Sequence, residues 1–176
     1  LNVLPPGVER YIVNGGGLTG IQILPDDEIE ILNNEGNQIC EISVFNKEGK
    51  SEPSILNLKE NKEASEIKSI LSKKDESSLI ALRQLKKRNL DISKSKSSIV
   101  FDKDTGWGEK IKIKSKDKCY CIFAAPGAEM LVHEQNPPTD LTIFVKRAKV
   151  TKDKELSVIP DPMFDPLNET NIDRAT

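Results

Sequence analysis

The chain has three cysteines and one histidine, residue types that often bind metal ions or take part in nucleophilic catalysis. Cys119 and Cys121 are two residues apart in a predicted strand, so their thiols point to the same face. With Cys40 or His133 on a neighbouring strand, the two thiolates could form a zinc site. The spacing is unlike that of a zinc knuckle, in which a turn separates the paired cysteines. Free cysteine is among the most buried residue types, which favours two core side chains instead.

The other motifs with chemical potential also have simpler interpretations. His133 could act as a general base only with a nucleophile and an orienting group within reach, and the sequence indicates neither. The triplet Gly15-Gly16-Gly17 matches neither GxGxxG nor GxxxxGK[ST], and a predicted strand follows it. It therefore predicts a turn, with no helix N-terminus after it to hold a phosphate. The sequence assigns no catalytic, cofactor-binding or metal-binding residue to this chain.

The elements that would position these residues are mostly strands. Alternating apolar and polar residues, separated by turn residues, predict about nine short strands. These are residues 8–13, 19–24, 28–32, 38–45, 98–102, 109–114, 118–125, 129–134 and 141–147. Residues 33–37 have the composition of a tight turn and predict a hairpin between the third and fourth strands. We expect a mainly β fold, an antiparallel β-sandwich or small barrel built mostly of hairpins.

A helical segment at about residues 58–90 interrupts the β pattern. Helical spacing of apolar residues predicts two amphipathic helices, the second beginning at the N-cap Asp75 and ending near Asn89. The apolar residues that define their faces are Ile67, Ile70, Leu71, Leu79, Ile80, Leu82 and Leu85. We expect this segment to pack on one side of the sheet.

Bulk composition excludes several classes of function. The 176 residues carry a net charge of −2, which gives no reason to expect a nucleic acid or an anionic membrane as partner. The longest apolar runs are too short to span a bilayer, and no secretory signal opens the sequence. Three cysteines cannot all pair, which argues against a disulfide framework. A reducing cytoplasm is the expected setting.

Both ends of the sequence predict a piece of a larger protein. The chain begins at Leu1, and Pro160, Pro162 and Pro166 favour an extended path in the closing segment. We therefore expect a β-rich domain over residues 1–150 and a Pro/Asp-rich linker over residues 151–176 that leads to a following domain.

Three blocks of sequence carry a family resemblance: PPGVERYIVNGGG, EGNQICEISVFNKEG and AAPGAEMLVHEQNPPTDLTIFVKRA. Together they resemble the first domain of aminomethyltransferase-like multidomain proteins, over about residues 4–149. In those proteins, domains of the urea-carboxylase-associated type precede a folate domain similar to the glycine-cleavage T-protein. The trimethylamine N-oxide demethylases are the most similar members. None of the family's metal ligands can be placed on Cys119, Cys121 or His133.

The resemblance implies a non-catalytic scaffold or interaction domain. A parent of this kind would convert trimethylamine N-oxide to dimethylamine and formaldehyde and pass the formaldehyde to tetrahydrofolate. Its metal ion, zinc or iron, and its folate site would lie in other domains. The expected partners are the following domains of the same protein, and the protein could also form a homo-oligomer. Two alternatives remain at this point: a small zinc-binding domain using Cys119 and Cys121, and an independent ligand-binding β-sandwich.

Overall fold

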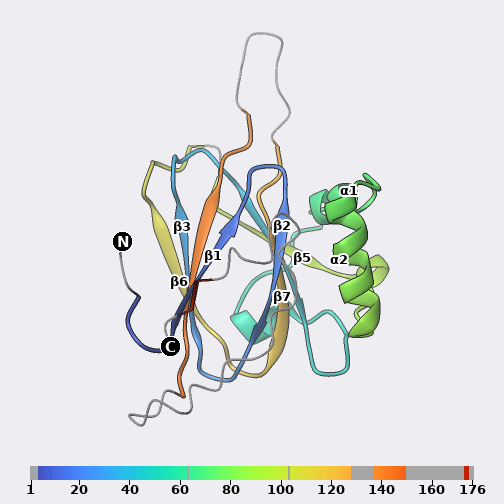
Figure 1. Cartoon of the computed structure of the whole chain (residues 1–176), viewed down its shortest axis with the longest axis horizontal. Helices are drawn as coiled ribbons and strands as arrows, with labels where there is room; N and C mark the ends of the chain where they lie inside the picture. The colour runs from blue at the N-terminus through green and yellow to red at the C-terminus, as the bar shows by residue number, and fades with distance from the viewer. Residues whose placement is uncertain (1–3, 63, 103, 128–136, 150–172, 175–176) are drawn as a thin grey trace.

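The computed structural model describes residues 4–62, 64–102, 104–127, 137–149 and 173–174, which form two antiparallel sheets packed face to face (Figure 1). The five-stranded sheet has the order β6-β3-β8-β1-β9 and the four-stranded sheet the order β2-β7-β4-β5. The strands are β1 (Val8–Val13), β2 (Leu18–Ile23), β3 (Glu28–Asn33), β4 (Cys40–Phe45), β5 (Ser97–Val100), β6 (Lys110–Lys114), β7 (Cys119–Ala124), β8 (Leu141–Lys146) and β9 (Asp173–Arg174). The mainly β sandwich expected from the sequence is confirmed. The predicted strand at 129–134 lies outside the described residues.

Strand pairing is nested along the chain. β1 pairs with β8, β2 with β7, β3 with β6 and β4 with β5, all antiparallel. The chain crosses to the opposite sheet at each of the first three connections, so β1 and β3 lie in one sheet and β2 and β4 in the other. This double-sheet arrangement is a jelly roll.

The predicted hairpin at residues 33–37 is wrong. β3 and β4 belong to different sheets, and the turn between them is hydrogen-bonded to the connection between β5 and β6. Asn33 N–H donates to Glu109 O at 2.8 Å, and Asn37 N–H donates to Thr105 O at 2.7 Å. The burial of the two strands explains the outcome. β3 is buried on one face only, whereas β4 is buried on both faces and therefore needs a sheet that is covered on both sides.

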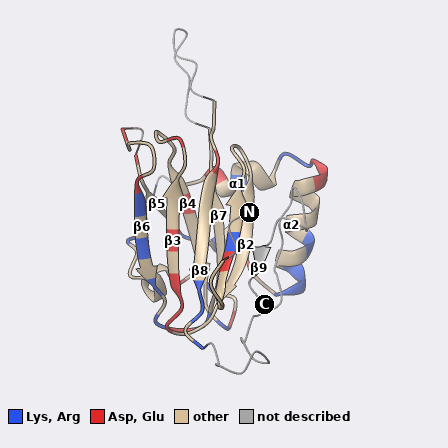
Figure 2. Cartoon of the chain, turned by 60° about the vertical axis from the view of Figure 1, so that its left-hand side comes forward, with Lys and Arg blue, Asp and Glu red and all other residues tan. Residues whose placement is uncertain are grey.

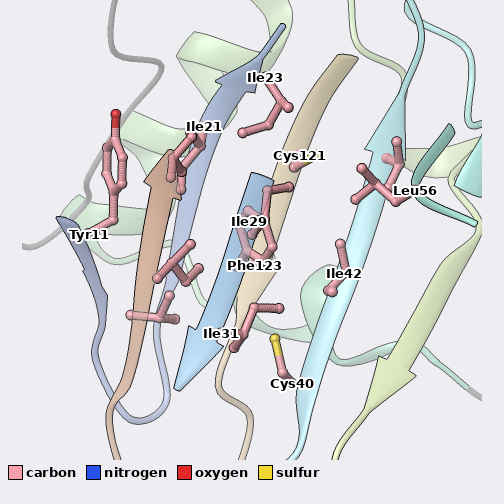
Figure 3. Packing of buried hydrophobic residues seen from close by; sticks show 14 of the residues in the cluster. Tyr11, Ile21, Ile23, Ile29, Ile31, Cys40, Ile42, Leu56, Cys121 and Phe123 are labelled. Atoms are coloured by element: carbon pink, nitrogen blue, oxygen red, sulfur yellow. The ribbon is translucent and has the colours of Figure 1, made fainter. Parts of the chain in front are cut away.

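The main core fills the space between the sheets (Figure 3). Alternate residues of each strand point into it, so that Ile29 and Ile31 of β3 face Ile42 of β4 and Phe123 of β7 across the sandwich. The side chains in this layer are mostly Ile and Val, which pack well on pleated surfaces.

A second core lies outside the four-stranded sheet. The helical segment between β4 and β5 covers the outer face of that sheet (Figure 1). The covering elements are α1 (Glu66–Leu71), α2 (Glu76–Lys87) and η2 (Ile92–Lys94), whereas Ile55 and Leu56 of η1 (Pro53–Leu56), in the same connection, pack into the main core. Ile67, Ile70 and Leu71 of α1 are buried, as predicted. Packing on one side of a sheet, expected from the sequence, is also confirmed.

The start of α2 is confirmed, but its predicted face is partly wrong. Asp75 is the N-cap, and its Oδ1 accepts a hydrogen bond from Ser78 N–H at 2.8 Å. Leu79 is 48% exposed, whereas Ser78, Ala81 and Leu85 are buried. Small residues at 78 and 81 allow the helix to approach the sheet closely, which turns Leu79 toward solvent.

A short strand within the predicted linker joins the five-stranded sheet. Asp173 and Arg174, within the predicted linker, pair with Arg10 and Glu9 at the edge of the five-stranded sheet. Among the residues that the structure describes, no helix is long and apolar enough to cross a membrane.

Candidate functional site

The cysteine pair lies on the inner face of β7, inside the main core. Cys119 and Cys121 are fully buried, and their Sγ atoms are 3.6 Å apart. Cys119 Sγ is also 3.7 Å from Ser115 Oγ. The prediction that the two thiols share a face is confirmed, because both belong to the cluster between the sheets while Tyr120 packs against the helices.

Cys40 does not join this pair. In the four-stranded sheet, Cys121 lies opposite Val44 of β4, and Cys40 is four residues farther along the same strand. At about 3.3 Å per residue this separation is roughly 13 Å, far beyond the span of one tetrahedral metal site. Figure 3 shows Cys40 beside Ile31 and Ile42, away from Cys121. Within the described ranges, no group of three or more His, Cys, Asp or Glu residues could hold a metal ion. His133 lies outside those ranges.

Burial also makes Cys40 and Cys121 poor nucleophiles and poor metal ligands. Desolvation raises the pKa of the Cys121 thiol well above its ordinary value, and the neighbouring Cys119 raises it further. Arg147 opposes this shift without reversing it. Burial, followed by the charge of Glu41, raises the pKa of Cys40 as well. Because the thiolate is the reactive and metal-binding form, the raised pKa values keep Cys40 and Cys121 protonated at neutral pH.

A buried ion cluster lies near the cysteine pair. Arg147, just after β8, binds Glu9 of β1 through Nε–Oε2 at 2.6 Å and Nη2–Oε1 at 2.9 Å. Its Nη1 donates to Asp27 Oδ2 at 2.7 Å and to Gln22 O at 2.9 Å. Tyr11 OH donates to Glu9. The side chains of Arg147, Glu9 and Asp27 are at most 2% exposed.

This cluster closes one end of the sandwich. Burial alone would lower the pKa of Arg147, but the hydrogen bonds and charges of Glu9 and Asp27 raise it above its ordinary value. Asp27 also accepts hydrogen bonds from Leu24 N–H and Ala148 N–H, each at 2.9 Å. With every charged group paired, the cluster connects β1, the β2–β3 turn and the end of β8, and it serves a structural role.

Sequence reasoning missed the cluster, although one signal was available. Glu9, Tyr11 and Val13 alternate along β1 and therefore share its inner face. A glutamate on an otherwise apolar strand face indicates a buried partner that would offset the cost of burying its charge. Only the fold identifies that partner as Arg147, which is 138 positions away.

The glycine triplet is a turn, as predicted. Its N–H groups donate to Asp140 Oδ1 at 2.9 Å, Ala125 O at 2.7 Å and Asn14 O at 2.8 Å. No backbone donor is therefore left to cradle a phosphate. A helix N-terminus does lie nearby, because a pocket of about 160 Å³ separates the triplet from the start of α2. The Asp75 and Glu76 carboxylates already occupy that end of the helix and disfavour an anion.

Glu41 is a second buried carboxylate and has a different environment. It lies on the helix-facing side of β4, where one oxygen accepts a hydrogen bond from Ile67 N–H of α1. The other oxygen, Oε1, is buried without a partner. Burial raises the pKa of Glu41, while the N–H groups of Ile67 and Glu66 and the charge of Lys68 act in the opposite direction. The Glu66 carboxylate adds to the rise.

The comparison with known proteins points to one enzyme. No family model matches the chain. The chain is 33% identical over 174 residues to trimethylamine-oxide aldolase from Ruegeria pomeroyi. The similarity covers 98% of this chain and 22% of that enzyme. The chain spans about a fifth of the length of that enzyme, and this coverage fits a domain of a larger protein.

Proposed function

We propose that this chain is a non-catalytic scaffold and interaction domain of a trimethylamine-oxide aldolase-like lyase. The supporting observation is the 33% identity over nearly the whole chain to only 22% of the aldolase from Ruegeria pomeroyi. The parent would cleave trimethylamine N-oxide to dimethylamine and formaldehyde in the cytoplasm. Its metal ion, zinc or iron, its tetrahydrofolate site and its urea-carboxylase-associated and T-protein-like domains would lie outside this chain.

The chemistry of the described residues supports a structural role. The cysteine pair is buried, the ion cluster is internally paired, and the N–H groups of the glycine turn are all hydrogen-bonded within the fold. These three groups of described residues therefore already contribute to the fold. The jelly roll with its covered sheet is well suited to present a rigid surface to neighbouring domains.

A chimera tests the proposal. The matching segment of the Ruegeria pomeroyi aldolase is replaced by this chain, and formaldehyde release from trimethylamine N-oxide is measured. We expect an active chimera, a loss of activity when the segment is deleted, and no activity from the 176-residue chain alone. Cys121→Ala in the chimera should leave the turnover per folded molecule unchanged. Formaldehyde release by the isolated chain, or an inactive but folded Cys121→Ala chimera, would overturn the proposal.

A metal site at Cys119 and Cys121 is the second candidate, favoured by the 3.6 Å distance between their Sγ atoms. Its remaining ligands would come from residues outside the described ranges, such as His133. Elemental analysis of the purified chain, together with thiol titration, distinguishes the two candidates. One equivalent of zinc that is lost in Cys119→Ser would establish the metal site. Metal-free protein, with three thiols that react with Ellman's reagent only after unfolding in urea, would support the scaffold.

A further inference from the structure

Strand β6 has one edge that no described strand covers. It pairs with β3 on its other side, where Asn33 N–H donates to Glu109 O at 2.8 Å and Ser115 N–H donates to Asp27 O at 2.9 Å. Hydrogen-bonded positions alternate along an antiparallel pair, so residues 111 and 113 bond to β3 between these two points. The N–H and C=O groups of residues 110, 112 and 114 therefore face outward from the sheet.

The side chains of β6 form two rows. Lys110, Lys112 and Lys114 are exposed on the outer face of the sheet, and Figure 2 shows this basic row along its edge. Ile111 and Ile113 point inward and pack against the main core. Lys110 forms an ion pair with Glu30 at 3.5 Å, whereas Lys112 and Lys114 have none among the described residues. Glu28 and Glu30 of β3 are fewer than the three lysines of β6, so this edge has an excess of positive charge.

An open groove lies beside the same edge. It has a volume of about 530 Å³ and lies between β6 and the segment that follows η1. Leu56, Leu58 and Ile113 provide apolar surface in this groove, and Lys112 and Lys114 line it as well. A strand added at the edge would direct alternate side chains to the apolar groove and to the lysine row.

The chain already contains a strand with the required pattern. On the covered side of β6, Glu28 and Glu30 of β3 lie opposite Lys114 and Lys112, and Ile29 of β3 lies opposite Ile113. A second segment that alternates acidic and apolar residues would make equivalent cross-strand pairs on the open side. A second copy of β6 would not, because it would place lysine opposite lysine.

We propose that β6 binds an extended segment of a partner polypeptide, with alternating acidic and apolar residues, as an added strand of the five-stranded sheet. Strand addition of this kind derives affinity from backbone hydrogen bonds and specificity from alternate side chains. The inference rests on the proposed role as an interaction domain, but it does not depend on which reaction the parent catalyses.

The test uses a peptide with the sequence of residues 27–33, DEIEILN, added to isotope-labelled chain. We expect shift changes and slower hydrogen exchange at the amides of Lys112 and Lys114, and little change at Ile111 and Ile113, whose N–H groups already bond to β3. A control peptide, DKIKILN, should not bind. Equal binding of the two peptides, or binding without any effect on the outward amides, would overturn the inference and leave the lysine row as a solvated edge.

Three variants separate charge from backbone pairing. Lys112→Glu combined with Lys114→Glu should weaken binding about tenfold or more, since two favourable pairs become repulsive. The matched control, Lys50→Glu with Lys62→Glu, changes two exposed lysines elsewhere and should bind normally. Lys112→Pro removes an outward N–H without breaking a bond to β3, so it should abolish binding, whereas Lys112→Gln should reduce it only modestly.

The outcome is independent of the chimera assay. Peptide binding together with an inactive chimera would overturn the proposed parent enzyme but not the added strand. An active chimera whose domain does not bind the acidic peptide would overturn the added strand alone.

Discussion

The two buried carboxylate environments of this sandwich differ in how their charge is compensated. Glu9 and Asp27 share the guanidinium of Arg147 at one end of the sandwich, and each carboxylate accepts three hydrogen bonds. Glu41, under the helices, accepts a hydrogen bond from the backbone N–H of Ile67 through one oxygen, and its other oxygen has no partner. The comparison shows that a buried charge is stable where long-range contacts provide a counter-charge, and remains able to titrate where they do not.

Removing the counter-charge should have the largest effect. Arg147→Met leaves Glu9 and Asp27 buried and unpaired, so we expect the free energy of unfolding to fall by about 3–5 kcal/mol. Urea denaturation measures this change. Lys146→Met, at the adjacent exposed position, is the control and should stay within about 0.5 kcal/mol of the parent chain. A similar small effect for Arg147→Met would show that the paired cluster contributes little.

The unpaired carboxylate should give a pH-dependent effect. The pKa of Glu41 is raised in the folded state, so protonation favours folding. The contribution is present below the unfolded pKa of about 4.3 and is lost as pH rises through the folded value. Glu41→Gln has no carboxyl group to ionise. Its free energy of unfolding should therefore exceed that of the parent chain by about 1–3 kcal/mol between pH 4 and neutral pH. A pH-independent difference between the two unfolding curves would contradict the assignment.

Loss of a single hydrogen bond in the Arg147 cluster should lower the free energy of unfolding by a smaller amount. Tyr11→Phe removes the hydroxyl that donates to Glu9, whose oxygens keep both contacts with Arg147. We expect a decrease of about 1 kcal/mol in the free energy of unfolding, because one hydrogen bond of many is lost without leaving a charge unpaired. If urea denaturation shows a loss as large as that of Arg147→Met, Tyr11 is as important as the counter-charge.

The smallest effect is expected at the exposed pair Lys110–Glu30. The two charged atoms are 3.5 Å apart, and the lysine side chain is 57% exposed. Lys110→Gln should change the free energy of unfolding by no more than about 0.5 kcal/mol, and high salt should remove the difference. A salt-independent effect would indicate that Lys110 contributes through packing instead.

Much of the local structure could be predicted from the sequence. Period-two alternation located eight described strands to within a few residues, and helical spacing located α1 and α2. Asp75 could be predicted as the N-cap of α2 because an N-cap depends on a hydrogen bond between near neighbours, here from Ser78 N–H to the Asp75 side chain. These features depend on neighbours a few positions apart, which a sequence displays directly.

Pairing between strands could not be predicted in the same way. Residues 33–37 have hairpin composition, yet the chain crosses there to the other sheet, because β4 is buried on both faces and β3 on one. Leu79 fits a helical apolar pattern, yet the close approach at Ala81 turns it outward. In both cases burial against distant segments overrode a local preference.

The sequence by itself determined the mainly β class, the inserted helices and the shared face of Cys119 and Cys121, since these follow from chain geometry. Only the tertiary structure decided the jelly-roll pairing, the distance of Cys40 from the other cysteines, and the pairing of Glu9 with Arg147. Those features depend on contacts between distant segments, such as Glu9 and Arg147, which are 138 positions apart, and such contacts form only when the whole core is buried at once.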